Sequence, residues 1–373
     1  MMPLRRLAVL FLALVALSGC EGKPSAPAAS APPATPVPEN TAPTPAPAPA
    51  PAPVPTPKTG MQVWALVRNS DPAGTLEKLV SHPAIDGIVY YTGLIRVAPA
   101  EGQFDWSTID KVLATARAAG KPVKLCICGG RWIPEWIYTK GAKKFEWSHT
   151  TQWVDAGTSK AVAPEPWDPI YLGAMKAAAQ SAGQRYANDP TLVEVQITGP
   201  ALANGLEMNL NITPEEAKAM GFTPERLATA WKSMVDAYAD AFPTKKLSLA
   251  LHNMVAGERR EDIAREVRDY AFKRVGNRLE LLVCYATHAD WFKAGNAAVD
   301  IWAEANGKIN LESQLIDIYS AKKQSPDLVA TAMRQSYALG GRTMELFSAD
   351  LLNDTYLNAV AAAREELTPK SNP

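Results

Sequence analysis

The chain has no excess of charge of either sign and contains few histidines. Its 373 residues include 38 Lys and Arg against 38 Asp and Glu, so the formal net charge is zero. A balanced chain offers no electrostatic basis for binding nucleic acid, and we exclude nucleic acid as a partner. The four histidines form no close cluster with Asp or Glu at the spacing of metal ligands. We therefore expect no metal and no other cofactor.

The four cysteines do not suit a disulfide framework. Cys20 lies near the N-terminus, whereas Cys126, Cys128 and Cys284 fall in strand-like runs. Three thiols cannot all pair with one another. Cys126 and Cys128 are neighbours on one face of one expected strand, which is a poor geometry for a disulfide. We interpret these three cysteines as buried thiols rather than as metal ligands.

Long hydrophobic runs are also missing, and the most apolar run is short and N-terminal. Arg5 and Arg6 precede an apolar core at residues 7–17, which is too short to span a bilayer of roughly 30 Å as a permanent helix. Residues 17–20 read LSGC and resemble the lipobox of bacterial lipoproteins. A lone membrane-spanning anchor is the alternative interpretation.

The lipobox resemblance implies a signal peptide over residues 1–19, cleavage before Cys20 and acylation of that cysteine. Several acyl chains would anchor the protein stably in a membrane of the cell envelope. Glu21 follows the cysteine in place of the aspartate that favours retention in the inner membrane. Family precedent therefore indicates the outer membrane if the cell is Gram-negative.

Residues 20–60 consist almost entirely of Pro, Ala, Thr and Ser. The segment has no apolar periodicity and cannot bury a core, so we expect it to be disordered. Proline-rich chain favours extended polyproline II at about 3.1 Å per residue. The segment is predicted to be a tether between the lipid anchor and the folded part.

Residues 61–373 alternate strand-like and helix-like segments over a length typical of one (β/α)8 barrel, the TIM-barrel architecture of the α/β class. Runs such as VKLCIC and LELLVCY suit strands that are buried on both faces. The expected strands are 62–67, 87–91, 122–128, 192–198, 246–252, 279–285, 308–312 and 342–347. The expected helices are 75–81, 107–119, 170–187, 223–242, 259–275, 291–306, 327–339 and 351–366, with a polar insertion at 140–163.

The stretch around the second and third expected strands carries a family resemblance. Residues 98–106 read APAEGQFDW, and residues 132–136 read WIPEW. This pattern is similar to that of clan A (β/α)8-barrel glycoside hydrolases, especially their β-galactosidase-like branch. There an E-P-x-E-G-x-F-D-W segment precedes a helix and a strand that ends in an aromatic-Pro-Trp turn. The spacing is more specific for the fold than for an activity.

The resemblance implies catalysis by two glutamates at the carboxyl ends of strands four and seven. Glu312 ends the expected strand seven, where the family places its nucleophile, although it would also suit a structural polar network. Strand four departs from the family pattern, because residues 198–200 read Thr-Gly-Pro where Asn-Glu-Pro is usual. The expected acid is therefore missing from its usual place.

Glu207, in the long loop after strand four, is the nearest candidate for the missing acid. It lies between Leu206 and Met208, and apolar neighbours raise the pKa of a carboxyl group, as a general acid requires. If Glu207 is instead an ordinary loop residue, the barrel binds a sugar without cleaving it. Glu345, in the expected strand eight, is the next candidate to pair with Glu312 if Glu207 is not the acid.

Several side chains near the expected strand ends are candidates for binding a sugar. Indole faces stack on sugar rings, and the indole N–H can bond a hydroxyl group. For each aromatic residue, packing in the core is the alternative role. For each histidine, the alternative role is a structural hydrogen bond. The candidate substrate-binding residues are Trp64, Arg131, Trp132, Trp136, Trp167, His252, Tyr285, His288 and Glu345.

The sequence as a whole predicts a lipid-anchored envelope protein whose barrel cleaves a glycan by a retaining mechanism, with Glu207 as acid/base and Glu312 as nucleophile. Its partners are then a carbohydrate and the membrane. The alternative is a catalytically inactive barrel that binds carbohydrate or has a structural role in the envelope.

Overall fold

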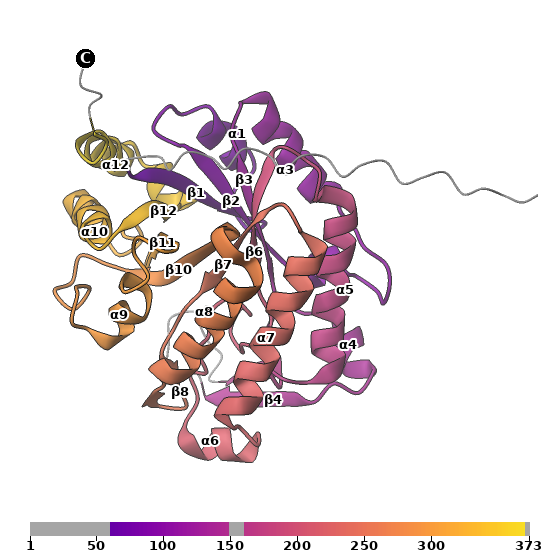
Figure 1. The fold of residues 1–373 in the computed structure, drawn as a ribbon. Helices are drawn as coiled ribbons and strands as arrows, with labels where there is room; N and C mark the ends of the chain where they lie inside the picture. Colours follow the sequence, from indigo (N-terminus) through magenta and orange to yellow (C-terminus); the bar gives the residue numbers. More distant parts are fainter. Residues whose placement is uncertain (1–59, 149–159, 370–373) are drawn as a thin grey trace, which may run out of the picture. The chain divides into compact units, whose positions relative to one another are not determined.

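The structure is a computed structural model that describes residues 60–148 and 160–369, and it confirms the predicted (β/α)8 barrel (Figure 1). The predicted signal peptide, Cys20 and nearly all of the tether lie outside the described residues. The barrel closes in the order β1-β12-β11-β10-β7-β6-β3-β2, and all neighbouring strands are parallel. The barrel strands are β1 (Gln62–Arg68), β2 (Gly87–Gly93), β3 (Val123–Cys128), β6 (Leu192–Ile197), β7 (Lys246–Ala250), β10 (Leu279–Ala286), β11 (Asn310–Leu315) and β12 (Gly341–Phe347).

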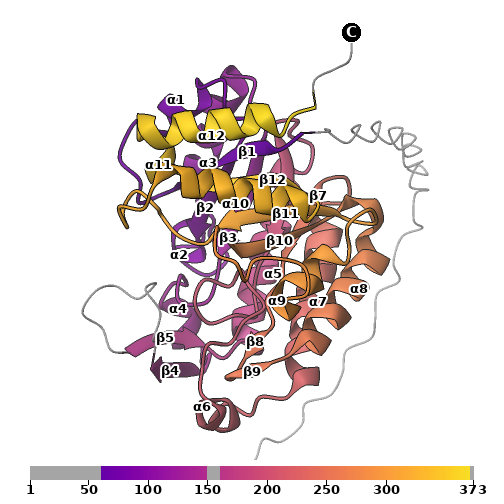
Figure 2. The ribbon, with the colours of Figure 1, turned by 90° about the vertical axis from the view of Figure 1, so that its left-hand side faces the viewer.

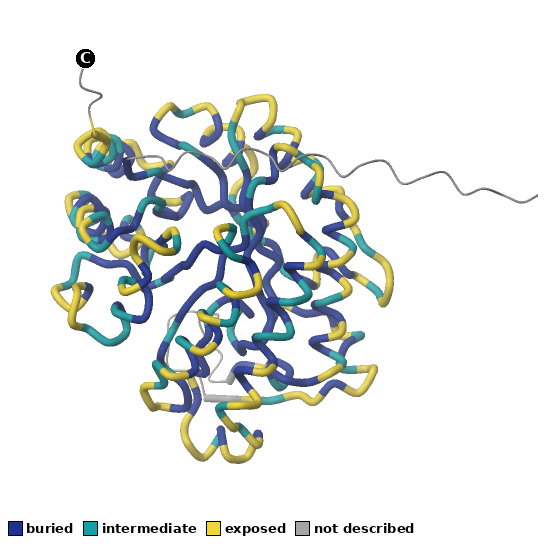
Figure 3. Tube along the Cα trace, viewed as in Figure 1, coloured by how far each residue is buried: buried dark blue, intermediate teal, exposed yellow. Residues whose placement is uncertain are grey.

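Helices surround the barrel, as Figures 1 and 2 show from two directions. Figure 3 shows the strands as buried and places much of the exposed chain on the outer helices and loops. None of the helices in the described stretches combines the length and apolarity needed to cross a membrane. The helices are α1 (Thr75–Val80), α2 (Leu94–Val97), α3 (Ser107–Ala118), α4 (Trp136–Thr139), α5 (Pro169–Tyr186), α6 (Pro214–Ala219), α7 (Pro224–Ala241), α8 (Glu261–Val275), α9 (Ala297–Ala303), α10 (Pro326–Ala338), α11 (Ser348–Leu351) and α12 (Asp354–Glu366).

Local sequence explains where the long helices begin. The Asp168 carboxylate accepts hydrogen bonds from the backbone N–H groups of Ile170 and Tyr171, and Pro169 occupies the first turn. Thr223 before α7 and Ser325 before α10 act in the same way, each followed by proline. Such caps satisfy N–H groups that a helix start leaves free, and proline loses no hydrogen bond there.

Two predicted helices are shorter than expected because polar side chains start new helices inside them. The Asn296 side chain accepts a hydrogen bond from the N–H of Ala298, so α9 begins only at Ala297. The C-terminal helix predicted over 351–366 begins only at Asp354 as α12, where the side chain of Asn353 caps its start, and the short α11 precedes it.

The predicted end of strand seven was also wrong. We expected that strand to stop at Glu312, but β11 begins at Asn310 and continues to Leu315. Ser313, Gln314 and Leu315 alternate in facing and stay buried, which is why the strand extends past the glutamate. Glu312 therefore lies inside the strand and not at its carboxyl end.

The segments that follow the barrel strands form small additional elements. Within the predicted insertion, β4 (Lys144–Ser148) pairs antiparallel with β5 (Lys160–Pro164). After strand five, β8 (Met254–Val255) pairs with β9 (Glu258–Arg259). The loop after β6 makes two isolated bridges, one that pairs Glu207 with Ala250 of β7 and one that pairs Leu210 with Val255 of β8.

The loop at residues 199–210 lies across the carboxyl ends of β3 and β6. The Gly129 N–H donates to the carbonyl of Asn204 at 2.9 Å, and the Arg131 N–H donates to the carbonyl of Leu202 at 3.0 Å. Gly205 makes this close approach possible, because its φ is +70° and a Cβ there would lie 2.7 Å from the Gly129 nitrogen. The loop is thus held against β3 by backbone contacts.

We expect Gly205→Ala to destabilise the protein more than Gly102→Ala. Gly102 has a similar φ of +68° but nothing within 4 Å of a built Cβ, so its substitution isolates the backbone cost of about 1 kcal/mol. The clash at Gly205 adds about 1–3 kcal/mol. Urea unfolding of both variants measures the difference. Equal losses in the two variants would show that the loop does not depend on this close approach.

Candidate active site

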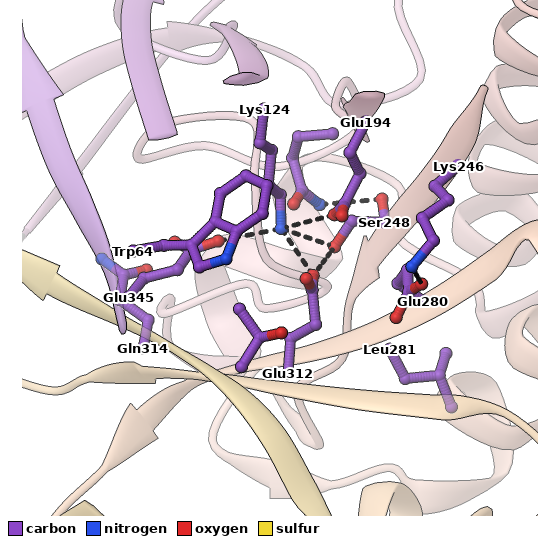
Figure 4. A network of polar contacts seen from close by, with 12 residues as sticks. Trp64, Lys124, Glu194, Lys246, Ser248, Glu280, Leu281, Glu312, Gln314 and Glu345 are labelled. Atoms are coloured by element: carbon purple, nitrogen blue, oxygen red, sulfur yellow. Dashed lines mark hydrogen bonds and ion pairs between the residues drawn. The ribbon is translucent and has the colours of Figure 1, made fainter. Parts of the chain in front are cut away.

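A buried cation lies at the centre of the barrel. Lys124, in β3, is 1% exposed, and its Nζ lies 2.6 Å from Glu312, 2.8 Å from Glu345 and 3.0 Å from Glu194. Nζ also donates to the Ser248 hydroxyl at 2.9 Å, and that hydroxyl donates to Glu312 at 2.8 Å. Figure 4 shows these side chains pointing toward one another from their strands. We call these five residues the Lys124 cluster.

The topology of the barrel explains this convergence. Side chains alternate between the inside and the outside along each strand, and a barrel layer receives residues from alternate strands. Lys124, Ser248 and Glu312 come from the third, fifth and seventh barrel strands. Glu194 and Glu345 come from the fourth and eighth strands and reach the same ammonium group. The cluster therefore connects five of the eight strands.

The Lys124 charge separates the pKa values of its neighbours. Burial alone would raise the pKa of Glu312, but the ion pair with Lys124 and hydrogen bonds from the cluster bring it below its usual value. Burial raises the pKa of Glu194, and the neighbouring Glu312 raises it further. Burial also raises the pKa of Glu345. Burial opposes the charge on Lys124, yet the three carboxyl groups hold its pKa above the usual value.

A layer of small and apolar side chains lies beside the cluster toward the carboxyl ends of the strands. Cys126 and Cys128 follow Lys124 on the same face of β3, and they pack with Ala250, Leu282 and, from the 199–210 loop, Leu206. All five of these residues are buried. We call them the apolar layer. It separates the Lys124 cluster from the solvent side of the loop.

The three cysteines of the barrel are free thiols, and two of them are buried as predicted. Cys126 and Cys128 are buried with their sulfurs 3.8 Å apart, and Cys284 is half-buried. Within residues 60–148 and 160–369, no group of three or more His, Cys, Asp or Glu side chains is arranged to hold a metal ion.

Glu207 lies at the edge of the apolar layer. It is half-buried, and burial raises its pKa to about 7. Burial raises the pKa values of Tyr285 and Cys284, both in β10, and the charge of Glu207 raises them further. A carboxyl group with a pKa near neutrality can both donate and accept a proton.

His252, which follows β7, and Tyr285, near the end of β10, form an aromatic pair. Their ring centroids are 5.2 Å apart in an edge-to-face arrangement, and the Tyr285 hydroxyl donates to the carbonyl of Ala298 at 2.6 Å. Burial lowers the pKa of His252 to about 4, so the ring is neutral at pH 7. Its Nδ1 accepts the N–H of Met254 at 3.0 Å, which leaves the proton on Nε2.

The four candidate tryptophans do not share one environment. Trp132 follows β3 and is 45% exposed, with the Arg131 guanidinium 5.2 Å from its ring centroid. Trp136 is half-buried, and its indole N–H donates to the carbonyl of Ala98. Trp64 is buried inside the barrel near Glu345 (Figure 4), and Trp167 is buried against Phe222. Sugar binding by these residues stays a prediction, and Trp132 is the most accessible of the four.

The remaining candidates lie in polar networks. The Glu345 carboxylate accepts a hydrogen bond from the Tyr91 hydroxyl at 3.2 Å, in addition to its contact with Lys124. His288 is half-buried, and its Nδ1 lies 2.9 Å from the Tyr319 hydroxyl.

Sequence reasoning missed Lys124, Glu194 and Ser248. The signal was present, because a lysine in VKLCIC and a glutamate in LVEVQI interrupt strands that are otherwise apolar. Charged residues in such strands are rarely buried unless they are paired. Opposite charges in two central strands therefore indicate a buried ion pair.

Comparisons with known proteins agree with this architecture. A family model described as β-galactosidase, glycoside hydrolase family 42, matches residues 91–201. The match includes the WIPEW turn and ends just before Glu207. No sequence among the curated proteins that were compared matches the chain significantly.

Solved structures share the barrel at low sequence identity. The β-amylase catalytic domain from Paenibacillus polymyxa has a TM-score of 0.61 and 12% identity, over 84% of this chain and all of that chain. The β-galactosidase from the psychrophilic Marinomonas ef1 has a TM-score of 0.53 and 10% identity, over 82% of this chain and 59% of that chain. The resemblance to barrel glycoside hydrolases is thereby confirmed, and the reaction must be argued from the site.

We expect Glu207 to make the stability of the protein depend on pH. Because its folded-state pKa is raised to about 7, the folded state holds the proton more tightly than the unfolded state. The free energy of unfolding should therefore fall as the pH rises from about 4.5 to about 7. In Glu207→Gln, the free energy of unfolding should fall less between pH 5 and pH 8, as measured by urea unfolding at the two pH values. Glu215→Gln, at an exposed position on α6, is the control and should keep the wild-type slope. An unchanged slope in Glu207→Gln would contradict the assignment.

Proposed function

We propose that the barrel binds a glycan at the carboxyl ends of its strands and hydrolyses a glycosidic bond with retention of configuration. The observation that carries the proposal is the opposite displacement of two pKa values. That of Glu207 is raised to about 7, whereas that of Glu312 is lowered. Two carboxyl groups with pKa values pushed apart suit an acid and a nucleophile.

In the proposed reaction, protonated Glu207 donates its proton to the leaving glycosidic oxygen. The Glu312 carboxylate attacks the anomeric carbon, and the bond to the leaving oxygen breaks. Water then attacks the glycosyl-enzyme bond while Glu207 accepts the proton from that water. A retaining mechanism of this kind requires carboxyl groups about 5–5.5 Å apart.

The surroundings of both residues support these roles. Lys124 and Ser248 hold the Glu312 carboxylate in one orientation and keep it ionised. Neutral His252 keeps its Nε2–H, which would donate to a sugar hydroxyl without adding charge. Tyr285 supplies an aromatic edge on the same side, and the exposed Trp132 offers a stacking surface after β3. Its neighbour Arg131 would bond a hydroxyl or a sugar carboxylate.

One observation favours a second candidate function, glycan binding without hydrolysis. Glu312 is 3% exposed and lies beside the apolar layer, which includes Leu206 of the 199–210 loop. Hydrolysis through Glu312 therefore requires this loop to move when substrate binds. A barrel in which the loop stays in place would bind sugar only through accessible side chains such as Trp132, which is exposed.

Hydrolysis is tested by screening the full chain against aryl glycosides and glycans. Glu207→Gln should lower kcat by about 10²–10⁴-fold, since it removes proton transfer to the leaving group. Glu312→Gln should abolish turnover. Nuclear magnetic resonance of the first product should show the retained anomer. An inverted product, or full activity in Glu312→Gln, would refute the proposed mechanism. Measurable glycan binding without any hydrolysis would favour the second function.

We also propose that the protein is a lipoprotein of the cell envelope, anchored through acylated Cys20. The LSGC sequence after a basic and apolar leader supports this proposal, and the location would be the outer membrane in a Gram-negative cell.

Cys20→Ser should move the protein from the membrane fraction to the soluble fraction, because no acyl chain can then be attached. Immunoblots of fractionated cells measure the partition. Cys284→Ser is the matched control and should stay in the membrane fraction. Unchanged partition of Cys20→Ser would rule out the lipid anchor.

A further inference from the structure

The barrel interior contains more carboxyl groups than cations. Lys124 is surrounded by three carboxyl groups, and a second ion pair links Lys246 with Glu280 near the amino ends of the strands. Asn310 donates a further hydrogen bond to Glu280 at 3.1 Å. Two cations therefore face four buried glutamates, which are Glu194, Glu280, Glu312 and Glu345.

Charge balance limits how many of these glutamates are ionised. An unpaired carboxylate in a low-dielectric interior is so costly that the group takes up a proton instead. Glu280 has its own partner in Lys246, and Glu312 has the shortest contact with Lys124 as well as the Ser248 hydroxyl. Glu194 and Glu345 are left without a cation of their own.

The geometry around Lys124 indicates the same distribution. The Lys124 Nζ atom lies 3.0 Å from Glu194 and 2.6 Å from Glu312, so the two carboxyl groups are close neighbours. Two ionised carboxylates side by side repel each other, so a proton on one of them is favoured. The Oε1 atoms of Glu194 and Glu345 are buried and accept no hydrogen bond, although both lie near the ammonium group. Lys124 has three protons for four neighbouring oxygens, and it donates to Ser248 and Glu312.

We infer that Glu194 and Glu345 are neutral carboxylic acids at neutral pH, and that Glu194 donates its proton in a hydrogen bond to the Glu312 carboxylate. Glu194 and Lys124 are then positioning residues for Glu312. This positioning role rests on the proposed function, whereas the protonation states do not.

The pKa directions agree with this distribution, because burial raises the pKa values of Glu194 and Glu345 while Glu312 is held low. The other titratable groups that face the cluster leave the balance unchanged. Burial raises the pKa values of Tyr91 and Cys126, which stay neutral.

The protonation states are measured directly by nuclear magnetic resonance of protein labelled with ¹³C at the glutamate carboxyl carbon. Glu194→Gln, Glu345→Gln and Glu312→Gln assign the three signals, each by the signal that it removes. In the wild type at pH 7, the signals of Glu194 and Glu345 should have the shift of a protonated acid, and that of Glu312 the shift of a carboxylate. An ionised Glu194 or Glu345, or a protonated Glu312, would overturn the inference.

Thermal unfolding gives a second measurement. Glu194→Gln replaces a neutral acid by a neutral amide that can still donate to Glu312, so its Tm should change by less than about 3 °C. Glu194→Met removes the donor and should lower Tm by more than Glu194→Gln does. A Gln variant that is as unstable as the Met variant would show that Glu194 is needed as a carboxylate.

The positioning role is tested by the pH profile of kcat/KM. Without the hydrogen bond from residue 194, the Glu312 carboxylate is less stabilised and its pKa rises. The acidic limb of the profile should therefore move to higher pH in Glu194→Met and return toward the wild-type position in Glu194→Gln. An unmoved limb in Glu194→Met would refute positioning. If the wild type hydrolyses no glycoside, the proposed function fails, while the carbon signals still decide the protonation states.

Discussion

The burial of the Lys124 ammonium group is the constraint on which the centre of this barrel depends. Transfer of a charge into a protein interior is favourable only when partners with good geometry surround it. Here they come from β6, β7, β11 and β12, and Lys124 and Glu312 alone are 188 residues apart in the sequence. The ion cluster can form only when the barrel has closed, and it directs the inward faces of five strands toward one point.

The polar cluster and the apolar layer divide the inside of the barrel into two environments. Beside Lys124, a glutamate is surrounded by a cation and hydrogen-bond donors, and ionisation is favoured. At the apolar layer, a glutamate has lost water without gaining a partner, and protonation is favoured. The same residue type thus acquires opposite acid–base character within one barrel. The roles that we propose for Glu207 and Glu312 follow from this division.

The motif that carries the family resemblance, at residues 98–106, makes structural contacts. Phe104 and Trp106 stack at 5.6 Å, Trp106 packs edge-to-face on Tyr186 of α5, and the Asp105 carboxylate accepts the N–H of Ser107 at the start of α3. These contacts attach the second βα unit to the neighbouring helix layer. A segment with this structural role identifies the architecture and constrains the chemistry of the site only weakly.

The sequence by itself determined the strand and helix order, because apolar runs, helix caps and glycine stops are local signals. It also determined that Glu207 has an apolar setting, since its chain neighbours Leu206 and Met208 are both buried. Only the tertiary structure decided that Glu312 lies inside β11, that Trp64 and Trp167 are buried, and that Glu194 and Ser248 join Lys124. These facts depend on barrel register, which brings together residues far apart in the chain. No local pattern specifies which of several buried carboxyl groups will meet the single ammonium group at the centre.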